Sequence, residues 1–356
     1  MKEDQIREYA WYEENLICPV DNLPLKIQGH TLWSPKGRIY PIVNGIPVML
    51  CDGAVSTLSV IESSLAYAKE EKGFVRDTEH LFLESVTISQ EDRMFVIRLF
   101  QEKKIKIDPV VSCLIGATNG NGYAHLIKKL ESYPIPALKL PVVEKNHHKK
   151  LLDMGCSWGR WSVAAARKGY EVVGIDPSLG AIAAAKRVSE QLQLPIKFIV
   201  ADARYLPFKK ESFDQVFSYS VLQHFSKEDV RLALQEVSRI LKENGKSLIQ
   251  MPNNLGARNL QVQLKRKFRK PKGFEVRYWP YQQLKKTFEE KIGKTKLAID
   301  CYFGLGLQAA DMAYMPLSHR LIIRLSEFLI KLSKKIIFLK YFSDSLYVES
   351  VKLSSK

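Results

Sequence analysis

Cysteine is scarce in this sequence, and its spacing offers no disulfide pattern. Five cysteines occur among 356 residues, an odd number with no Cys-x-x-Cys pair. This argues against a disulfide framework and against an intact zinc knuckle. We therefore expect a fold held together by its apolar core in a reducing cytosol. The five are Cys18, Cys51, Cys113, Cys156 and Cys301.

Long apolar runs are also missing. No stretch of about 18 consecutive apolar residues occurs, and the N-terminal residues are charged. We expect neither a signal peptide nor a transmembrane segment. The predicted location is cytoplasmic, with peripheral contact at a membrane surface left open.

Acidic residues are few relative to basic ones. The 54 lysines and arginines outnumber 38 aspartates and glutamates, which gives a formal net charge of +16 and a pI near 9.4. Such a positive field attracts nucleic acid, phosphorylated metabolites or anionic lipid headgroups. Charge alone does not choose among these partners.

Residues 1–51 predict a small β-rich module. Short β-branched runs are broken by Asn-Gly and proline, and the segment closes with Tyr-Pro-Ile-Val-Asn-Gly-Ile-Pro. This segment resembles the zinc-ribbon-like activator domain that partners certain tRNA- and ribosome-modifying methyltransferases. The zinc ligands are lost, because only Cys18 is present and Asp21, Trp33 and Lys36 stand at the other ligand positions. We expect a structural remnant without metal.

Residues 52–150 predict a helical lead-in or cap, and the pattern changes at Leu151. From there strands alternate with helices, which indicates an α/β fold with a parallel sheet and helices on both faces. Residues 151–356 therefore form the main domain. We expect strands near residues 150–154, 171–175, 196–200, 214–219, 246–251, 297–303 and 345–352.

Two features in this domain predict a nucleotide-like ligand. The first strand runs into Asp-Met-Gly-Cys-Ser-Trp-Gly at residues 153–159, a glycine-containing turn that lets backbone and helix amides approach a ligand. Asp176 ends the second strand, where a carboxylate can accept both hydroxyls of a ribose. Dehydrogenases and methyltransferases both fit these features.

A third motif separates the two classes. Val-Ala-Asp-Ala-Arg-Tyr-Leu-Pro-Phe at residues 200–208 is followed by a strand that leads to Val-Leu-Gln-His-Phe at residues 221–225. In this order and spacing, the three motifs resemble the class I S-adenosylmethionine-dependent methyltransferases over roughly the last 200 residues. The resemblance implies a Rossmann-like seven-stranded sheet, S-adenosyl-L-methionine as cofactor and S-adenosyl-L-homocysteine as product.

The resemblance also implies the cofactor-binding residues. Asp153 would face the methionine end of the cofactor, Asp176 the ribose, and Asp202 with the Ala203 amide the adenine. Ser157 stands where the family usually has glycine, a tolerable change if its φ stays negative. The predicted set is Asp153, Gly155, Cys156, Ser157, Gly159, Asp176, Pro177, Asp202, Ala203, Ser218 and Ser220.

The sequence identifies no indispensable base and no metal ligands. His224, just past the fourth strand, is the candidate catalytic base, and the alternative is a side chain that only shapes the pocket. Asp153 and Asp202 have an alternative role as helix caps, and Cys156 as a small buried apolar residue.

Two long connections leave the carboxyl ends of the strands, where open α/β sheets bind ligands. Segment 252–278 carries eight lysines and arginines against one acid, and segment 304–342 combines cations with apolar residues at helical spacing. One interpretation is a solvated basic face over a core helix. The other is an entrance for an anionic substrate, with residues 320–340 on an anionic membrane surface.

These features predict a methyltransferase whose acceptor is anionic, a small metabolite or a nucleotide- or lipid-linked precursor. An RNA methyltransferase acting on tRNA or rRNA stays open, because the N-terminal resemblance favours it. A non-catalytic, cofactor-binding regulatory subunit stays open as well. The missing base weighs little against an enzyme, since methyl transfer to a nucleophilic acceptor needs chiefly alignment and proximity.

Overall fold

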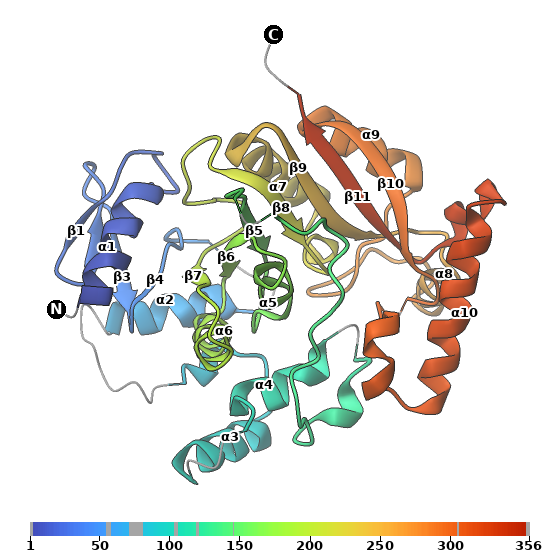
Figure 1. Cartoon of the computed structure of the whole chain (residues 1–356), viewed down its shortest axis with the longest axis horizontal. Helices are drawn as coiled ribbons and strands as arrows, with labels where there is room; N and C mark the ends of the chain where they lie inside the picture. The colour runs from blue at the N-terminus through green and yellow to red at the C-terminus, as the bar shows by residue number, and fades with distance from the viewer. Residues whose placement is uncertain are drawn as a thin grey trace.

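The computed structural model describes residues 3–54, 58–70, 81–102, 106–118, 121–144, 146–304 and 306–353. Its main body is a seven-stranded sheet of order β10-β11-β9-β8-β5-β6-β7 (Figure 1). The α/β class and all seven predicted strands are confirmed. The strands are β5 (Lys150–Met154), β6 (Glu171–Asp176), β7 (Lys197–Val200), β8 (Phe213–Ser218), β9 (Leu241–Pro252), β10 (Gly293–Cys301) and β11 (Ser345–Lys352).

The sheet is mixed, which corrects the expectation of a parallel one. Strands β5 to β9 pair in parallel, whereas β11 is antiparallel to both neighbours, β9 and β10. The reason is the connection that follows β10. The chain turns back at the end of the sheet where β10 finishes, and β11 then runs in the opposite direction between β10 and β9. Strand β10 also starts at Gly293, four residues before the predicted 297.

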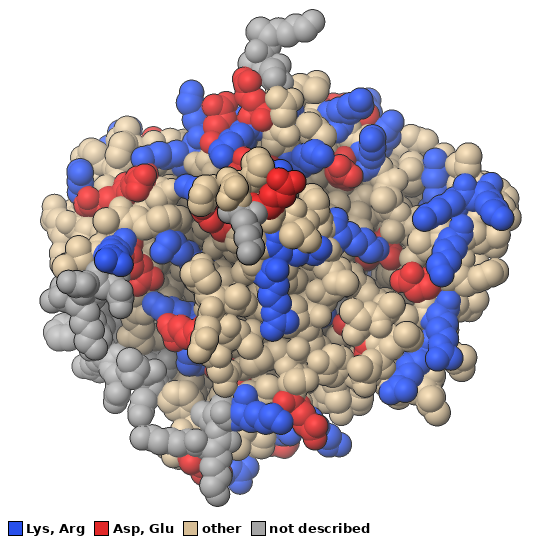
Figure 2. Space-filling view, viewed as in Figure 1, with Lys and Arg blue, Asp and Glu red and all other residues tan. Residues whose placement is uncertain are grey.

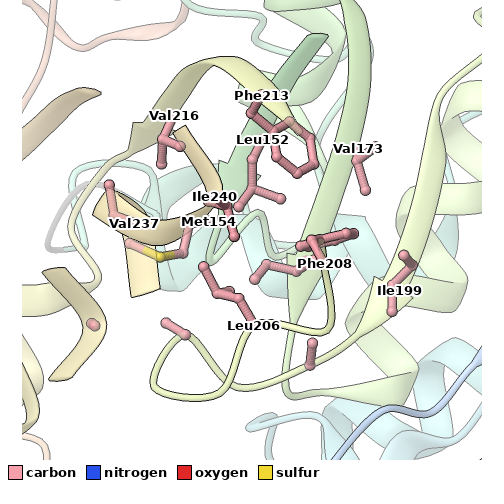
Figure 3. Close-up of a cluster of buried hydrophobic side chains, with 14 of the residues drawn as sticks. Leu152, Met154, Val173, Ile199, Leu206, Phe208, Phe213, Val216, Val237 and Ile240 are labelled. Carbon is pink, nitrogen blue, oxygen red and sulfur yellow. The ribbon is translucent and has the colours of Figure 1, made fainter. Parts of the chain in front are cut away.

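Consecutive apolar residues of the central strands point to opposite faces of the sheet, and both faces are buried. Leu152 and Val216 on one face pack with Val237 and Ile240 of helix α7 (Figure 3). Leu151 on the other face packs in a cluster with helix α5. This burial on both sides is what a doubly wound sheet requires. The flanking helices are α5 (Arg160–Ala166), α6 (Leu179–Gln191), α7 (Lys227–Ile240) and α9 (Tyr281–Lys291).

The N-terminal module adds a small sheet at the β7 edge of the main one (Figure 1). The amide of Met49 donates to the Val200 carbonyl at 2.7 Å, and that of Ile17 to the Pro207 carbonyl at 3.0 Å. Helix α1 (Glu3–Asn15), which the sequence did not predict, packs against this module. The strands of the module are β1 (Lys26–Gln28), β2 (Thr31–Trp33), β3 (Ile39–Val43) and β4 (Ile46–Pro47).

Two of the side chains at the expected zinc positions, Cys18 and Asp21, are bonded to other side chains of the module. Cys18 Sγ lies 3.1 Å from the Tyr40 hydroxyl, and Asp21 accepts a hydrogen bond from Ser34 Oγ at 2.9 Å. Among the residues described, no three histidine, cysteine or acidic side chains gather as a metal site would need. The zinc-ribbon resemblance stays a prediction.

The lead-in packs against helix α6 of the main domain. The Leu179 amide donates to Ser64 Oγ at 3.0 Å and the Gly180 amide to Ser85 Oγ at 2.7 Å. These contacts hold the lead-in next to the turn after β6. Its elements are α2 (Val60–Glu70), η1 (Leu83–Ser85), α3 (Gln90–Glu102), α4 (Pro109–Leu114), η2 (Ile115–Ala117) and η3 (Ala124–Leu126).

Both basic inserts contain helices, and α10 (Leu317–Ser333) in the second has 17 residues. None of the helices in the described ranges is long and apolar enough to cross a membrane. The remaining elements are η4 (Leu222–His224), α8 (Ala257–Lys265), η5 (Ala309–Tyr314), α10 (Leu317–Ser333) and η6 (Ile337–Phe342).

Candidate active site

The loop between β5 and α5 lies at the carboxyl edge of the sheet and bends toward β6. The amides of Gly155 and Cys156 both donate to the Ile175 carbonyl, at 2.8 and 2.9 Å. Gly155 has a φ of +78°, and a Cβ there would come within 2.2 Å of the Val221 side chain. Glycine is therefore required, and the loop lies directly against the segment that follows β8.

Ser157 departs from the conformation expected of it. Its φ is +49°, in the left-handed region, instead of negative. This places its amide 3.0 Å from Asp176 Oδ2, and the Ser178 amide lies 3.0 Å from Asp176 Oδ1. Burial raises the pKa of Asp176 to about 6 although the two amides oppose it. The carboxylate is thus oriented by two backbone donors, and Asp176 as a residue is half-buried.

Asp153 is turned away from solvent. It is 1% exposed and accepts a hydrogen bond from Ser162 Oγ at 2.6 Å, which ties β5 to α5. Burial raises its pKa to about 7. Cys156 is buried too, and burial raises the pKa of its thiol. At Asp153 and Cys156 this turn therefore offers a ligand mainly backbone groups.

Asp202 has an intramolecular partner that the motif did not predict. Arg204 binds its carboxylate through Nη2 at 2.6 Å and Nε at 3.0 Å, and the Arg204 amide donates to it at 2.9 Å. Arg204 also lies 3.2 Å from Asp229. The spacing of two residues between Asp202 and Arg204 is the sequence feature that could have indicated this ion pair. In the described part of the chain, the adjacent Ala203 amide donates to no protein acceptor.

The predicted serines after β8 differ in role. Ser218 Oγ is buried and donates to the Met154 carbonyl at 2.8 Å, so it braces β8 against β5. The Ser220 amide donates to Gln250 Oε1 at 2.9 Å, and Gln250 Nε2 donates to Ser345 Oγ at 2.7 Å. Ser220 has a φ of +61° and lines a cavity.

This cavity has a volume of about 580 Å³ and lies beyond the carboxyl ends of β8 and β9. One wall is the turn after β8. Another is the insert 252–278, which the sequence predicted to lie at the ligand-binding edge of the sheet. Lys267 and Lys270 of the same insert do not line it. The charged lining residues are Arg258, Lys265, Arg266, Arg269, Glu275 and Asp344.

The acids in this cavity are already satisfied. Glu275 makes a two-point ion pair with Arg269, both contacts at 2.6 Å. Asp344 is buried and accepts the amides of Asn259 at 2.9 Å and Phe303 at 2.6 Å. The remaining cations therefore leave the cavity positive.

Arg266 is one of these remaining cations. Its guanidinium lies 5.0 Å over the Tyr278 ring, and its Nη1 donates to the Val276 carbonyl at 3.1 Å. Its Nε is buried with no hydrogen-bond partner among the described residues. Lys265 beside it is exposed. An anionic group in the cavity would meet both.

His224 lies beside this cavity but is not among its lining residues; Gln223 is. Its ring stacks on Phe274 with centroids 3.6 Å apart, and its Nδ1 lies 2.7 Å from the Phe274 carbonyl. Gln223 Nε2 lies 3.1 Å from His224 Nε2. Burial lowers the pKa of His224 to about 4, so the ring is neutral at pH 7. Nδ1 is engaged with the insert and Nε2 with the neighbouring Gln223, and a catalytic role stays a prediction.

A buried hydrogen-bond network borders the cavity, and it was not predicted from the sequence. The Tyr219 hydroxyl donates to Asp300 Oδ2 at 2.8 Å, and Ser345 Oγ donates to the same atom at 2.8 Å. Burial raises the pKa of Asp300, and Lys139 Nζ lies 3.7 Å from its carboxylate. No motif marks these residues, although Asp300 falls within a predicted strand.

Part of this chain is similar in sequence to known methyltransferases. Residues 151–245 match the family model described as a methyltransferase domain. The ubiquinone biosynthesis O-methyltransferase of Pelagibacter ubique is 38% identical over 96 residues, which cover 27% of this chain and 39% of that protein. The uncharacterized methyltransferase YcgJ of Bacillus subtilis is 29% identical over 113 residues, 32% of this chain and 44% of the other.

The chain spans about two fifths of the length of these relatives. Among solved structures, phosphoethanolamine N-methyltransferase 2 of Haemonchus contortus has a TM-score of 0.42 at 20% identity, over 60% of this chain and 51% of that one. The motifs, the strand order and the family match together support a class I S-adenosylmethionine-dependent methyltransferase domain at residues 151–245.

Proposed function

We propose that this chain is an S-adenosylmethionine-dependent methyltransferase that holds an anionic acceptor, a small metabolite or a nucleotide- or lipid-linked precursor, in the cavity beyond β8 and β9. One observation carries the proposal. The turn after β8 has Val221 against the glycine of the cofactor motif on one side, and Tyr219 and Ser220 in the wall of the basic cavity on the other. Donor and acceptor would meet at this turn.

The residues present fit the cofactor. Asp176 keeps unused lone pairs beside the two amides that orient it, and these can accept the ribose hydroxyls. The Ala203 amide is free to donate to the adenine ring. Asp202 departs from the family's pattern, because Arg204 already occupies much of its carboxylate. When bound, S-adenosylmethionine supplies a methyl group activated by a positively charged sulfur.

The chain's own contribution is alignment in a partly desolvated site. Arg266 and Lys265 would hold the anionic part of the acceptor, and the turn at Ser220, fixed by Gln250, would set the position of the reacting atom. Proximity of this kind lowers the barrier to a displacement without a general base when the acceptor is already nucleophilic. This agrees with the engaged, neutral state of His224.

The test is methyl transfer from radiolabelled S-adenosylmethionine by the full chain into separated lipid, small-metabolite and RNA fractions of a cell extract. We expect label in an anionic metabolite or lipid, and a strong loss with Asp176→Asn. Label in RNA alone would favour the RNA methyltransferase. Cofactor binding by calorimetry with no label in any fraction would favour the regulatory subunit.

A further inference from the structure

Helix α10 exposes its apolar side. Leu317, Leu321, Leu325 and Phe328 follow one another at spacings of four, four and three residues, so they share one face of the helix. Their side chains are 76%, 65%, 49% and 59% exposed. A helix that packs on a domain normally buries such a stripe. Here the opposite face is the buried one.

The buried face of α10 is small and is fixed by polar contacts. Ile323 and Ser326 are its buried residues, and Ser326 Oγ accepts the Tyr302 amide at 3.0 Å. This bond attaches α10 to the end of β10. The outward direction of the apolar stripe is therefore set by the packing of the helix.

Segment η6 also exposes large apolar side chains. Ile337, Phe338 and Phe342 are 65%, 61% and 50% exposed. The Tyr302 hydroxyl donates to the Leu339 carbonyl at 3.1 Å, so η6 and α10 are attached to the same end of β10. Together they leave a surface of large apolar side chains that nothing in the described structure covers.

The charge beside this surface is almost wholly positive. Residues 317–342 contain six lysines and arginines and the single acid Glu327. Arg324 and Lys331 follow Leu321 and Phe328 by three residues, so they border the apolar stripe. Figure 2 shows lysine and arginine side chains along the right-hand side of the molecule, where Figure 1 places α10.

We propose that α10 and η6 form a docking surface for an anionic phospholipid bilayer. Large apolar side chains with bordering cations match the acyl boundary and the headgroups of such a membrane. RNA would match the cations but leave the apolar stripe without a partner. The helix lies in the membrane plane, since it is too short and too charged to cross.

Docking in this way would bring the cavity to the lipid. Gly304 and Gly306, which follow the Tyr302 anchor of α10, line the cavity. Asn253 Nδ2 donates to the Tyr341 carbonyl at 2.6 Å, which joins the basic insert to the end of η6. If methyl transfer occurs as proposed, a lipid-linked acceptor reaches the cavity from the bilayer.

The experiment is cosedimentation of the full chain with vesicles, without methyl donor, so its outcome is independent of catalysis. Vesicles of phosphatidylcholine alone are compared with equal parts of phosphatidylcholine and phosphatidylglycerol. We expect binding to the mixed vesicles, and at least a tenfold lower partition coefficient for the double variant Leu321→Asp and Phe328→Asp. Met94→Asp with Val142→Asp is the control, since these side chains are 59% and 70% exposed elsewhere.

A third variant separates charge from apolar contact. Lys331→Gln, Lys334→Gln and Lys335→Gln together should weaken binding to the mixed vesicles and reduce its dependence on salt. Wild-type protein that ignores mixed vesicles, or an apolar variant that binds as wild type does, would overturn the proposal. Dimers in light scattering that the apolar variant dissociates, without vesicle binding by either protein, would identify an interface between copies instead.

Discussion

The amide of Ser157 donates to Asp176 Oδ2 at 3.0 Å, and it does so from a left-handed conformation with a φ of +49°. This bond joins the turn after β5 to the end of β6. The strained serine and the oriented carboxylate therefore belong to one arrangement.

Replacing Ser157 by glycine should leave stability unchanged or raise it by up to about 1 kcal/mol. Glycine removes the left-handed strain, although it adds freedom to the unfolded chain. Ser157→Val should lower the free energy of unfolding by about 1–2 kcal/mol, because a β-branched residue tolerates this conformation poorly. Urea unfolding of the three proteins gives the order. A valine variant as stable as the glycine variant would contradict the assigned conformation.

Replacing Asp176 by asparagine should weaken S-adenosylmethionine binding by roughly 1–3 kcal/mol, because ribose hydroxyls lose a charged acceptor. Calorimetry with S-adenosylmethionine and S-adenosylhomocysteine measures the loss. Asp214→Asn is the matched control. Asp214 lies near the start of β8, at the amino ends of the parallel strands and away from Asp176, and it accepts a hydrogen bond from the Lys150 amide. Equal affinity in both variants would place the cofactor elsewhere.

Asp153 should make the stability of the cofactor-free protein fall as pH rises from about 4 to 7. Burial raises the pKa of its carboxyl to about 7, whereas the unfolded chain ionises near 3.8. In this window the folded state binds more protons than the unfolded state, so raising the pH favours unfolding. Relative to Asp153→Asn, wild type should lose on the order of 4 kcal/mol across the window. Urea unfolding at several pH values measures this, and parallel pH profiles would show that Asp153 is ionised in the fold.

The main sheet was predictable because its signals are local. The apolar run at 150–154 is followed at once by the glycine turn, and the structure begins and ends β5 at those residues. The pairing of Val200 with Val48 joins distant segments, and no local pattern indicates it. Helix α1 was missed as well, since its polar sequence has no strong apolar stripe and its stability comes from packing on the module.

The candidate site was predictable only in part, for the same reason. The motif predicts Asp176 and Asp202 as cofactor-binding residues, but the ion pair between Asp202 and Arg204 depends on a side-chain conformation. The cavity is assembled from segments more than a hundred residues apart. Periodicity revealed the apolar stripe of α10, yet it does not tell which side of a helix faces the domain.

The cavity cations give the sharpest test of acceptor binding, because one insert holds both lining and non-lining lysines. Lys265→Gln with Arg266→Gln removes two lining charges, and Lys267→Gln with Lys270→Gln removes two that lie outside the lining. The first pair should raise the acceptor's Michaelis constant about tenfold or more, since each charge-assisted hydrogen bond contributes roughly 1.5–3 kcal/mol.

The second pair should change that constant little, and neither pair should alter cofactor affinity by more than about twofold, because Asp176 and the Ala203 amide lie outside the cavity lining. Salt should weaken acceptor binding in wild type and in the second pair, and less so in the first. Steady-state kinetics at two ionic strengths measures both effects. Equal increases from the two pairs would mean that the insert acts only through its general positive field, and that the cavity does not bind the anion directly.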